Sequence, residues 1–533
     1  MTGSRAAAFR VQRAITGKTH MQLQYQVLAA YLLGKRWFAA KGRKIAKIEI
    51  VARDIWNAAG GSWLLTVLQV HFTATEPQLY FLPLALAREH EVGDERLQAL
   101  GCWILDKVRQ RTHAGILYDA FGDERFCRAL VQGIADNLTL PAAHGEIAFR
   151  TTHAVKNFTA DIAAPVRHPG LEQSNTAVYF GNRLFLKGYR RLQIDRNPEV
   201  EVGQFLTEHS SFPNIVPVYG SIEYRGSDGR TMTLALLQAY IDNQGSGWNY
   251  VLDCAARFVL EHLADPAAEA LPAGGSPHDL FLARMETLGI RTAQLHRVLC
   301  STTGNPAFDP EPFPPEEVMA WLERLRREAA ATLEQLALLR ETYTGELHGA
   351  CSRLLKLREE LTDRIGHTLP LPLAVMKARY HGDYHLGQVL LVHNDFVITD
   401  FEGEPGRPLK ERRLKHSPLR DVAGMLRSFS YAAAIAVNRC TMDLCTDRRV
   451  LASMAQTWET ETGAAFLKGY RSTIAGCPCW PGDAETADRM IDLFLIEKAL
   501  YELRYEMDNR PDWVAIPLHA LLRELGQEFP RTT

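Results

Sequence analysis

Two carboxylates and one amide lie close together in the sequence between His381 and Arg420. Asp383 precedes an apolar run, Gln388 stands five positions later, and Asp400 ends a second apolar run. Phosphoryl transfer needs such a set, because the protein has mainly to place a hydroxyl, hold Mg²⁺ on the phosphates and neutralise charge. We therefore predict that Asp383 is the catalytic base and that Gln388 and Asp400 hold Mg²⁺.

The element that must position these residues is a β-hairpin. Two apolar runs flank an Asn394-Asp395 turn, which is typical of paired strands. The layout places both carboxylates at the same end of the hairpin. Protein kinases use an Asp, an Asn five residues later and a second Asp. Here Gln replaces Asn and Phe401-Glu402 replaces Phe-Gly, so the general kinase motifs match only loosely.

A second group of candidate residues lies about 200 positions earlier. A polar loop with Ser174, Asn175 and Thr176 precedes two predicted strands, and the second strand carries Lys187. This is the order of a kinase nucleotide lobe, in which the lysine neutralises the α- and β-phosphates of ATP. The usual glycines are missing, so the three polar residues would supply hydroxyl, amide and backbone N–H donors.

The predicted helix after this lobe begins at Pro198 and carries Glu199 and Glu201. Either carboxylate can fix the ammonium of Lys187. Two further strands complete an antiparallel sheet, and the segment from Gln238 to Tyr240 then leaves it as a hinge that would offer backbone groups to adenine. Only the order of the segments supports the hinge, because backbone recognition leaves no pattern of side chains.

The C-terminal half is mostly helical by its apolar spacing. Tyr501 with Tyr505, and Glu502 with Glu506, are spaced i, i+4, so each pair shares a helix face. Carboxylates beside aromatic rings suit a sugar, whose hydroxyls need acceptors and whose C–H faces need an apolar surface.

Two other residues of this half are predicted to have structural roles. His296 is expected to be a satisfied core residue. Asp421 is expected to accept N–H bonds from the turn that contains Asp383.

The longer strings are more specific than any of these motifs. HGDYHLGQVLL, DFEGEPGRPLKERR and SPLRDVAGMLRSFSYAA together resemble the signature of bacterial maltokinases, relatives of aminoglycoside phosphotransferases with a protein-kinase-like fold. The resemblance implies ATP- and Mg²⁺-dependent phosphorylation of maltose at its anomeric hydroxyl. The product would be maltose 1-phosphate for α-glucan and glycogen synthesis, with trehalose synthase as a suggested partner.

The resemblance also assigns residues. It favours Glu201 as the partner of Lys187, because the family has a carboxylate immediately before Val. One guanidinium between residues 403 and 416 is expected at the phosphoryl group or the sugar. The resemblance and the spacing together give these candidate substrate-binding residues: His381, Glu402, Arg413, Lys498, Tyr501, Glu502, Tyr505 and Glu506.

The expected fold is α+β and bilobal, like that of a protein kinase. Residues 1–18 are predicted to be a disordered lead-in and residues 19–110 an α+β cap that begins with a family-like Trp37 to Arg43 string. Residues 111–240 would hold an intermediate segment and a small antiparallel nucleotide lobe. Residues 241–533 would form a large helical lobe with the catalytic hairpin at 381–402.

Composition narrows the function classes. A formal charge of −2 over 533 residues gives no general attraction to nucleic acid or an anionic membrane. Nine cysteines make no disulfide framework, and Cys477-Pro478-Cys479 lacks the second pair that a zinc site needs, so reduced thiols in the cytoplasm are expected. No apolar run approaches the roughly 20 residues of a membrane helix.

Three alternatives stay open. The first is a kinase of the same fold that acts on glucosamine or another small sugar. The second is a pseudokinase that serves only as a binding module, and the third is a hydrolase with paired carboxylates. The presence of Lys187, Asp383 and Asp400 argues against the second, and the order of the nucleotide lobe argues against the third.

Overall fold

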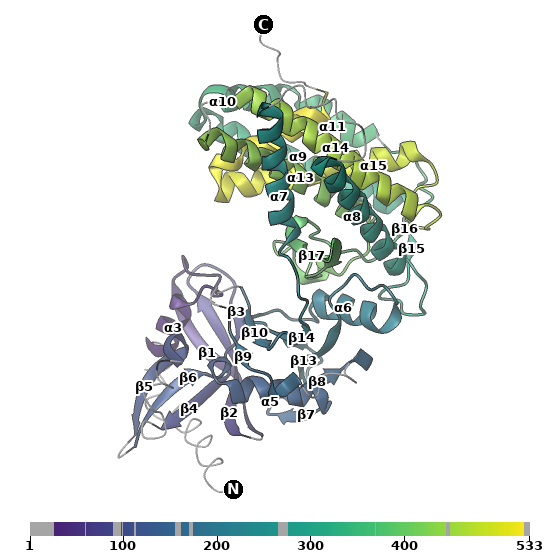
Figure 1. Ribbon diagram of the computed structural model, residues 1–533. Helices are drawn as coiled ribbons and strands as arrows, with labels where there is room; N and C mark the ends of the chain where they lie inside the picture. Colours follow the sequence, from purple (N-terminus) through teal and green to yellow (C-terminus); the bar gives the residue numbers. More distant parts are fainter. Residues whose placement is uncertain are drawn as a thin grey trace. The chain divides into compact units, whose positions relative to one another are not determined.

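The computed structural model describes residues 26–58, 60–88, 98, 100–110, 113–154, 161–169, 174–264, 276–367, 369–443 and 448–526, so the predicted lead-in lies outside them. The chain divides into two compact units (Figure 1). Unit 1 comprises Met1–Ser211 and Val216–Asp242, and unit 2 comprises Phe212–Ile215 and Asn243–Thr533. The main boundary therefore falls just after the segment predicted to be the hinge.

Unit 1 begins with a helix and a seven-stranded antiparallel sheet in the order β12-β3-β2-β4-β6-β5, with β1 paired to β2. The elements are α3 (Leu28–Gly34), β1 (Ile45–Ala58), β2 (Gly61–Phe72), β3 (Gln78–Phe81), β4 (Leu84–Arg88), β5 (Ile104–Gln110), β6 (His113–Asp119) and β12 (Arg191–Leu192). Trp37 and Phe38 are buried against this sheet, while Lys41 and Arg43 are exposed. The sheet continues to Asp119, beyond the cap boundary predicted at residue 110.

The region predicted to be the nucleotide lobe contains a second seven-stranded sheet, in the order β7-β8-β13-β14-β11-β10-β9. Its strands are β7 (Thr139–Ala142), β8 (Gly145–Thr151), β9 (Val166–Arg167), β10 (Thr176–Phe180), β11 (Leu184–Gly188), β13 (Val218–Gly226) and β14 (Thr231–Ala239). Two helices accompany it, α5 (Glu124–Ala135) and α6 (Pro198–His209). The adjacent pairs in this sheet are antiparallel, as the sequence predicted.

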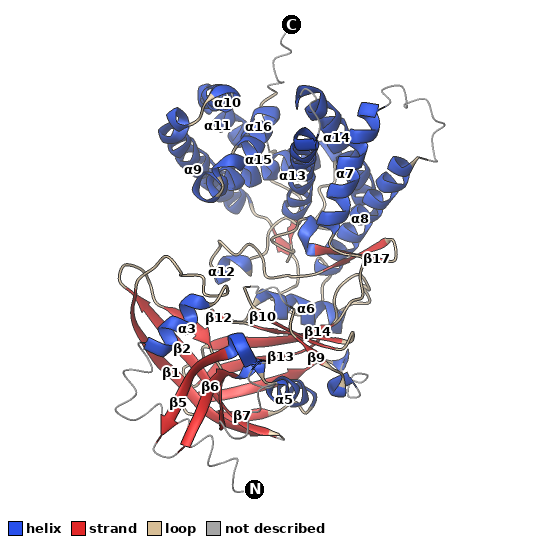
Figure 2. Ribbon diagram, turned by 60° about the vertical axis from the view of Figure 1, so that its left-hand side comes forward, coloured by secondary structure: helices blue, strands red, loops and turns tan. Residues whose placement is uncertain are grey.

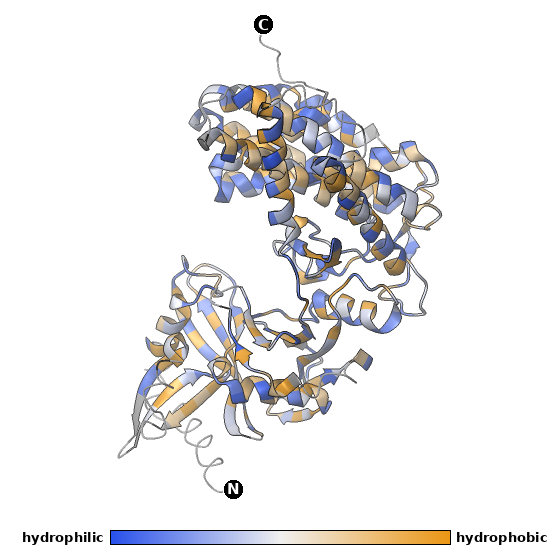
Figure 3. Cartoon of the chain, viewed as in Figure 1, coloured by the Kyte–Doolittle hydropathy of each residue, from blue (hydrophilic) through white to orange (hydrophobic). Residues whose placement is uncertain are grey.

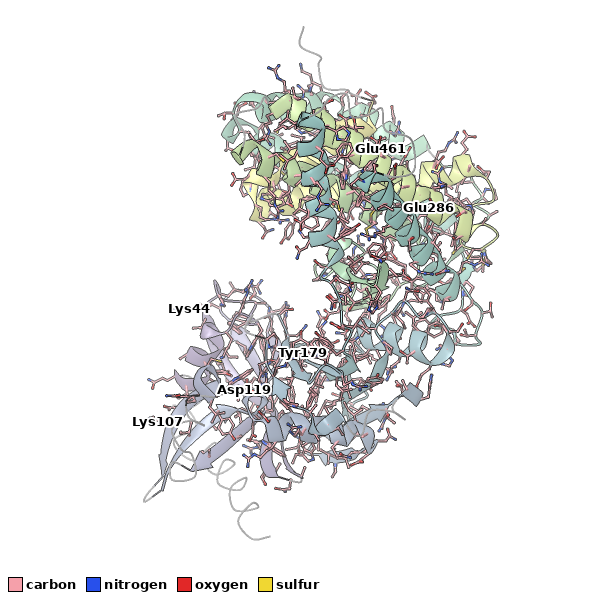
Figure 4. All side chains as sticks on the ribbon, in the orientation of Figure 1. Lys44, Lys107, Asp119, Tyr179, Glu286 and Glu461 are labelled. Atoms are coloured by element: carbon pink, nitrogen blue, oxygen red, sulfur yellow. The ribbon has the colours of Figure 1, made fainter. Side chains whose placement is uncertain are left out.

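A buried ion pair ties the two sheets of unit 1 together. Arg190 is fully buried, and its Nη2 lies 2.7 Å from Oδ2 of Asp119, the last residue of β6 (Figure 4). Its Nε donates to Oγ1 of Thr176 at 2.5 Å, and the hydroxyl of Tyr31 donates to Asp119 at 3.0 Å. Burial raises the pKa of Tyr31 well above its ordinary value, with Asp119 adding to the rise. Strands from both sheets thus share one polar centre.

We expect Arg190→Met to destabilise unit 1, because it leaves the buried Asp119 carboxylate without its cation. Removing one partner of a buried pair costs about 3–5 kcal/mol in free energy of unfolding. Urea denaturation followed by circular dichroism would measure the change. Arg191→Met is the matched control, since Arg191 is exposed and its replacement is expected to change stability by less than about 0.5 kcal/mol. Equal stability of the two variants would contradict this account.

Unit 2 is mainly helical (Figure 2). Its helices are α7 (Gly247–Ala264), α8 (Pro277–Leu299), α9 (Pro315–Leu339), α10 (Gly345–Lys356), α11 (Arg358–His367), α12 (Leu409–Arg412), α13 (Leu419–Asp443), α14 (Arg448–Ile474), α15 (Ala484–Asn509) and α16 (Ala515–Glu524). Two short strand pairs complete it, β15 (Glu311–Pro312) with β16 (Met376–Lys377), and β17 (Val389–Val392) with β18 (Asp395–Ile398).

Helix α13 contacts α7, α14 and α15 and so lies in the middle of unit 2. Its buried side chains include Val422, Met425 and Phe429, while Leu426 is half-buried. The helices of unit 2 carry both apolar and polar residues along their length (Figure 3), as expected of helices with one buried face. Among the described residues, no helix combines the length and apolarity needed to cross a membrane.

Candidate active site

The turn that carries Asp383 is held by one buried carboxylate. The backbone N–H groups of His381 and Gly382 donate to the two oxygens of Asp421 at 2.7 and 2.9 Å. Gly382 has a φ of +86°, which a residue with a side chain rarely adopts. Asp421 also lies 3.1 Å from Nε2 of His296, whose Nδ1 contacts the Tyr470 hydroxyl at 2.9 Å. The predicted roles of Asp421 as support and His296 as a core residue are confirmed.

We expect Asp421→Asn to weaken both stability and turnover, because an amide cannot accept both N–H bonds and face His296 as a carboxylate does. Hydrogen bonds to a charged group contribute about 1.5–3 kcal/mol each, so a loss of about 2–4 kcal/mol in unfolding free energy is expected. Thermal unfolding and a steady-state kinase assay would measure the two effects. Asp253→Asn is the control, since Asp253 is exposed in its ion pair with Arg439. A variant that matched this control would contradict the supporting role.

The predicted hairpin is confirmed as β17 and β18, with Val389 opposite Ile398 and Val392 opposite Asp395. The turn residues are His393 and Asn394, not the Asn394-Asp395 that the sequence indicated. Both have positive φ, +48° and +67°, as a two-residue turn between twisted strands requires.

Asp395 is therefore the first residue of β18, and it serves a different purpose. Its two carboxylate oxygens accept from Nε and Nη2 of Arg291 on α8, at 3.0 and 2.7 Å. This bidentate ion pair fastens the hairpin to α8.

The two predicted metal ligands lie together at the end of the hairpin. The side-chain amide of Gln388 donates to Oδ2 of Asp400 at 3.2 Å. Asp400 has a φ of +66°, a left-handed conformation that is uncommon without a turn or a functional reason. Mg²⁺ prefers oxygen ligands, and a carboxylate beside an amide oxygen fits that preference. These residues are therefore suited to hold Mg²⁺, which would supply neutralisation of phosphate charge.

Asp383 opens onto a pocket of about 470 Å³, including the part open to solvent. Its side chain is 20% exposed, and Lys498 Nζ and His385 Nε2 lie 3.8 and 3.9 Å from its two oxygens. These separations exceed hydrogen-bond length, so neither contact occupies the carboxylate oxygens as a hydrogen bond. Tyr501 lines the same pocket. The structure thus brings the predicted base together with Lys498 and Tyr501 of α15.

Lys498 stays charged beside this carboxylate because a second acid holds it. Its Nζ donates to Glu404 at 2.7 Å, and Arg407 Nε donates to the other Glu404 oxygen at 2.6 Å. Burial lowers the pKa of Lys498, but the Glu404 and Asp383 carboxylates raise it more, so the net shift is upward. For Glu404, burial raises the pKa and the charges of Lys498 and Arg407 lower it below its usual range.

The remaining pocket charges are paired as well. Glu497 contacts Arg420, which also donates to the Tyr380 hydroxyl at 3.3 Å, and Arg407 Nη2 lies 3.8 Å from Glu497. The sequence did not single out Glu404, Glu497 or Arg420 for the site. The available signals were weak: Glu404 and Arg407 are three residues apart in a loop, and Glu497 precedes Lys498 on the helix already under consideration.

The carboxylates of α15 that were predicted to bind sugar are engaged elsewhere. Glu502 lies 2.8 Å from Arg427 Nη2, and Glu506 lies 2.6 Å from Arg510 Nη2. Neither is among the residues that line the described pocket, and Tyr505 is 45% exposed on the surface. The i, i+4 spacing places the two glutamates on one face of α15, but Arg427 of α13 pairs with Glu502 on that face. A direct sugar contact by Glu502, Tyr505 or Glu506 stays a prediction.

The other candidates of this segment have the following positions. His381 is 1% exposed, and its Nε2 bonds the Thr399 carbonyl oxygen at 2.9 Å, which fixes the approach of the second strand. The Glu402 carbonyl oxygen accepts from Arg412 Nη1 at 3.0 Å. Arg413 directly follows α12. Substrate contacts by His381, Glu402 and Arg413 stay predictions.

In unit 1, Lys187 lies on β11 and pairs with a glutamate of α6. Its Nζ is 2.7 Å from Oε2 of Glu199, which is 2% exposed and also accepts from the Tyr189 hydroxyl at 2.5 Å. This corrects the preference for Glu201. Residues two positions apart on a helix point about 200° apart, so the two glutamates cannot present the same face to β11.

Some of the other residues that were predicted to bind the nucleotide already make contacts within unit 1. Ser174 and Asn175 directly precede β10, while the Thr176 hydroxyl is taken by Arg190. Gln238 is buried on β14 between two strands. The Tyr240 N–H donates to the Arg183 carbonyl at 2.8 Å, and the Tyr240 ring lies edge-on to the Tyr179 ring. Contacts of these residues with a nucleotide stay predictions, as does the convergence of Lys187 with Asp383 and Asp400.

Comparisons with known proteins agree with this architecture. Residues 31–123 match the family model of the maltokinase N-terminal cap domain. A glucosamine kinase of Streptacidiphilus jiangxiensis is 25% identical over 81% of this chain and 88% of its own. A glucosamine kinase of Mycolicibacterium smegmatis is 25% identical over 66% of this chain and 79% of its own.

Solved structures are similar over nearly the whole length. A glucosamine kinase in complex with glucosamine, ADP and inorganic phosphate gives a TM-score of 0.63 at 18% identity, covering 93% of this chain and 96% of that one. Another crystal form of glucosamine kinase gives a TM-score of 0.63 at 18% identity and covers 98% of this chain and 98% of that one. The chain therefore has the fold of these glucosamine kinase structures. At its N-terminal end it carries a cap that matches the maltokinase family model.

Proposed function

We propose that the protein is an ATP- and Mg²⁺-dependent sugar kinase that phosphorylates maltose at its anomeric hydroxyl. The observation that carries the proposal is the position of Asp383 on a braced turn at the edge of a pocket, with the Gln388 and Asp400 pair on the adjoining hairpin. The relatives named as glucosamine kinases support the class of sugar kinase, and one structure of similar fold is a complex with glucosamine, ADP and inorganic phosphate.

The chain's own residues then have the following roles. Asp383 orients the acceptor hydroxyl and takes its proton. Lys187, fixed by Glu199, neutralises phosphate charge. Gln388 and Asp400 supply oxygen ligands for Mg²⁺. Lys498, held by Glu404, is placed to donate to a sugar hydroxyl beside Asp383.

The charged side chains of the pocket are paired with one another, which suits a neutral acceptor such as maltose. Glu404 and Glu497 each have cationic partners, Asp421 accepts two backbone N–H groups, and Asp383 lies beside the Lys498 ammonium. A protonated amino sugar would bring a further cation close to Lys498, at a cost in repulsion. The maltokinase-type cap and the strings around Asp383 and Asp400 also support maltose.

Glucosamine is the second candidate, because the two curated relatives with that name match most of their own lengths. The two substrates differ in the expected product. Phosphorylation at the anomeric hydroxyl removes the reducing end of the sugar, whereas phosphorylation at any other hydroxyl leaves it. With maltose as substrate, the product would feed α-glucan synthesis, and trehalose synthase is a plausible source of the maltose.

The test is a coupled assay of ADP release with the purified chain, ATP, Mg²⁺ and a panel of maltose, glucose, glucosamine, trehalose and an aminoglycoside. We expect maltose to give the highest kcat/KM, with loss of reducing-sugar reactivity and a phosphorus NMR signal coupled to the anomeric proton. A higher kcat/KM for glucosamine than for maltose would make glucosamine the preferred substrate, and the protein would still be a sugar kinase. No turnover with any sugar, by protein that still binds ATP, would favour a binding module instead.

A further inference from the structure

Three cysteine sulfurs that the proposed function does not use gather inside unit 2. Cys300 is the C-cap residue of α8, while Cys477 and Cys479 lie in the loop between α14 and α15. All are free thiols, and they are 4%, 6% and 3% exposed. The three Sγ atoms lie within 4.8 Å of one another. One buried cysteine behaves as a small apolar side chain, but three that converge can supply thiolate ligands once their protons are released.

The sulfur positions suit a tetrahedral cation. A Zn–S bond of about 2.3 Å places sulfurs roughly 3.8 Å apart around such an ion. The Cys477 and Cys479 sulfurs are 3.3 Å apart, and Cys300 lies within the 4.8 Å limit of both. Small side-chain rotations therefore suffice to bring all three to one ion. Cys300 supplies the further sulfur that Cys477-Pro478-Cys479 lacks in the sequence.

The loop that carries two of the sulfurs is already fixed by its backbone. The Cys477 N–H donates to the Ile474 carbonyl at 3.0 Å, and the Trp480 N–H donates to the Cys477 carbonyl at 2.9 Å. The Pro478 carbonyl accepts from Met376 N–H at 2.9 Å. Proline also restricts φ between the two cysteines. A ligand that needs both sulfurs would thus lose little ordering entropy on binding.

The surrounding charges favour a cation with several thiolates. Helix α8 ends immediately before Cys300, and α14 ends at Ile474, whose carbonyl bonds the Cys477 N–H. The carbonyl ends of both helices carry partial negative charge, which stabilises a cation. Three thiolates and one divalent cation together carry a charge of −1. The Arg297 guanidinium offsets it from nearby, where it donates to the Thr473 and Ala475 carbonyls at 3.3 and 3.1 Å.

We propose that Cys300, Cys477 and Cys479 bind one divalent cation of the Zn²⁺ class, with a fourth position left to a solvent oxygen. Each thiol releases its proton to solvent as its sulfur binds, so binding is stronger at higher pH. The cation joins the end of α8 to the loop before α15. His296, one turn before Cys300, contacts the Asp421 that braces the turn of Asp383. Because the cation joins two segments of the fold, its role is structural. Its loss lowers the melting temperature more than it changes KM.

The experiment uses the full chain, purified without chelator after growth with Zn²⁺. Mass spectrometry of the metal content is expected to give about one Zn²⁺ per chain. Replacement by Co²⁺ is expected to give the intense near-ultraviolet absorption of thiolate-to-cobalt charge transfer. Cys477→Ser and Cys479→Ser are expected to lose both signals. Cys351→Ser is the matched control and is expected to keep them, because Cys351 is a buried thiol of α10 outside the cluster.

Three results would overturn the proposal. One is wild-type protein with no stoichiometric metal and no Co²⁺ charge-transfer band, a measurement that does not depend on the folding of any variant. Another is an intact mass two hydrogens lower, which would show a disulfide in place of a metal site. The last is full metal retention in both Cys477→Ser and Cys479→Ser, which would place the ion elsewhere. None of these results bears on the choice of sugar.

Discussion

Asp383→Asn is expected to lower turnover by about 10²–10⁴-fold, the contribution typical of a general base. The amide keeps the volume of the carboxylate but cannot take the proton of the acceptor hydroxyl. Because the ion pairs that Asp383 makes with Lys498 and His385 are long, at 3.8 and 3.9 Å, the fold should lose little stability. A steady-state assay should therefore show a fall in kcat with the KM for ATP nearly unchanged.

The same hairpin offers a matched control for this experiment. Asp395→Asn makes the identical chemical change on β18, where the carboxylate pairs with Arg291. We expect this variant to lose some thermal stability and to keep turnover within a few-fold of wild type. If Asp383→Asn kept more than a tenth of wild-type turnover, Asp383 would not be the base. A loss of turnover in both variants with a loss of folded protein would instead indicate a structural role for the whole hairpin.

Much of the fold was predictable from local patterns. The hairpin, the helix start at Ser276-Pro277 and the inward face of α13 follow from apolar spacing and turn or cap residues, which act over a few positions. The braced turn was predictable as well, since Asp421 stands at the start of a helix two strands beyond Gly382. The exact turn residues were not, because the choice between His393-Asn394 and Asn394-Asp395 depends on strand register.

The ion-pair partners were less predictable than the elements. Glu199 and Glu201 are equivalent in charge and local context, and only the rotation of α6 against β11 selects Glu199. Likewise, the sequence cannot show that α13 presents Arg427 to Glu502 and so diverts it from the pocket. The three-cysteine cluster could not be predicted for the same reason, because Cys300 reaches Cys477 and Cys479 through the packing of α8 on α14. That packing includes the surface pair of Glu286 with Lys468 (Figure 4).

Asp400→Asn is expected to lower kcat/KM by at least about 10²-fold and to raise the Mg²⁺ concentration needed for half-maximal rate. A metal ion contributes several kcal/mol of charge stabilisation in the transition state, and each 1.36 kcal/mol is tenfold in rate. Asparagine tolerates the left-handed φ of +66° at this position, and its amide oxygen can still accept from Gln388. The variant thus removes the negative charge and leaves the backbone and the local hydrogen bond in place.

Gln388→Leu tests the contribution of the Gln388 amide to Mg²⁺ binding separately from the charge of Asp400. It removes a neutral oxygen donor but leaves the Asp400 carboxylate, so the Mg²⁺ requirement should rise less than in Asp400→Asn. Binding of Mn²⁺ in the presence of ATP, followed by electron paramagnetic resonance, checks the same order without turnover. An unchanged Mg²⁺ dependence in Asp400→Asn would place the ion on other residues. Loss of a charged ligand should cost more Mg²⁺ affinity than loss of a neutral one. A larger effect of Gln388→Leu than of Asp400→Asn would therefore mean that the amide of Gln388, and not the carboxylate of Asp400, is the main Mg²⁺ ligand on the hairpin.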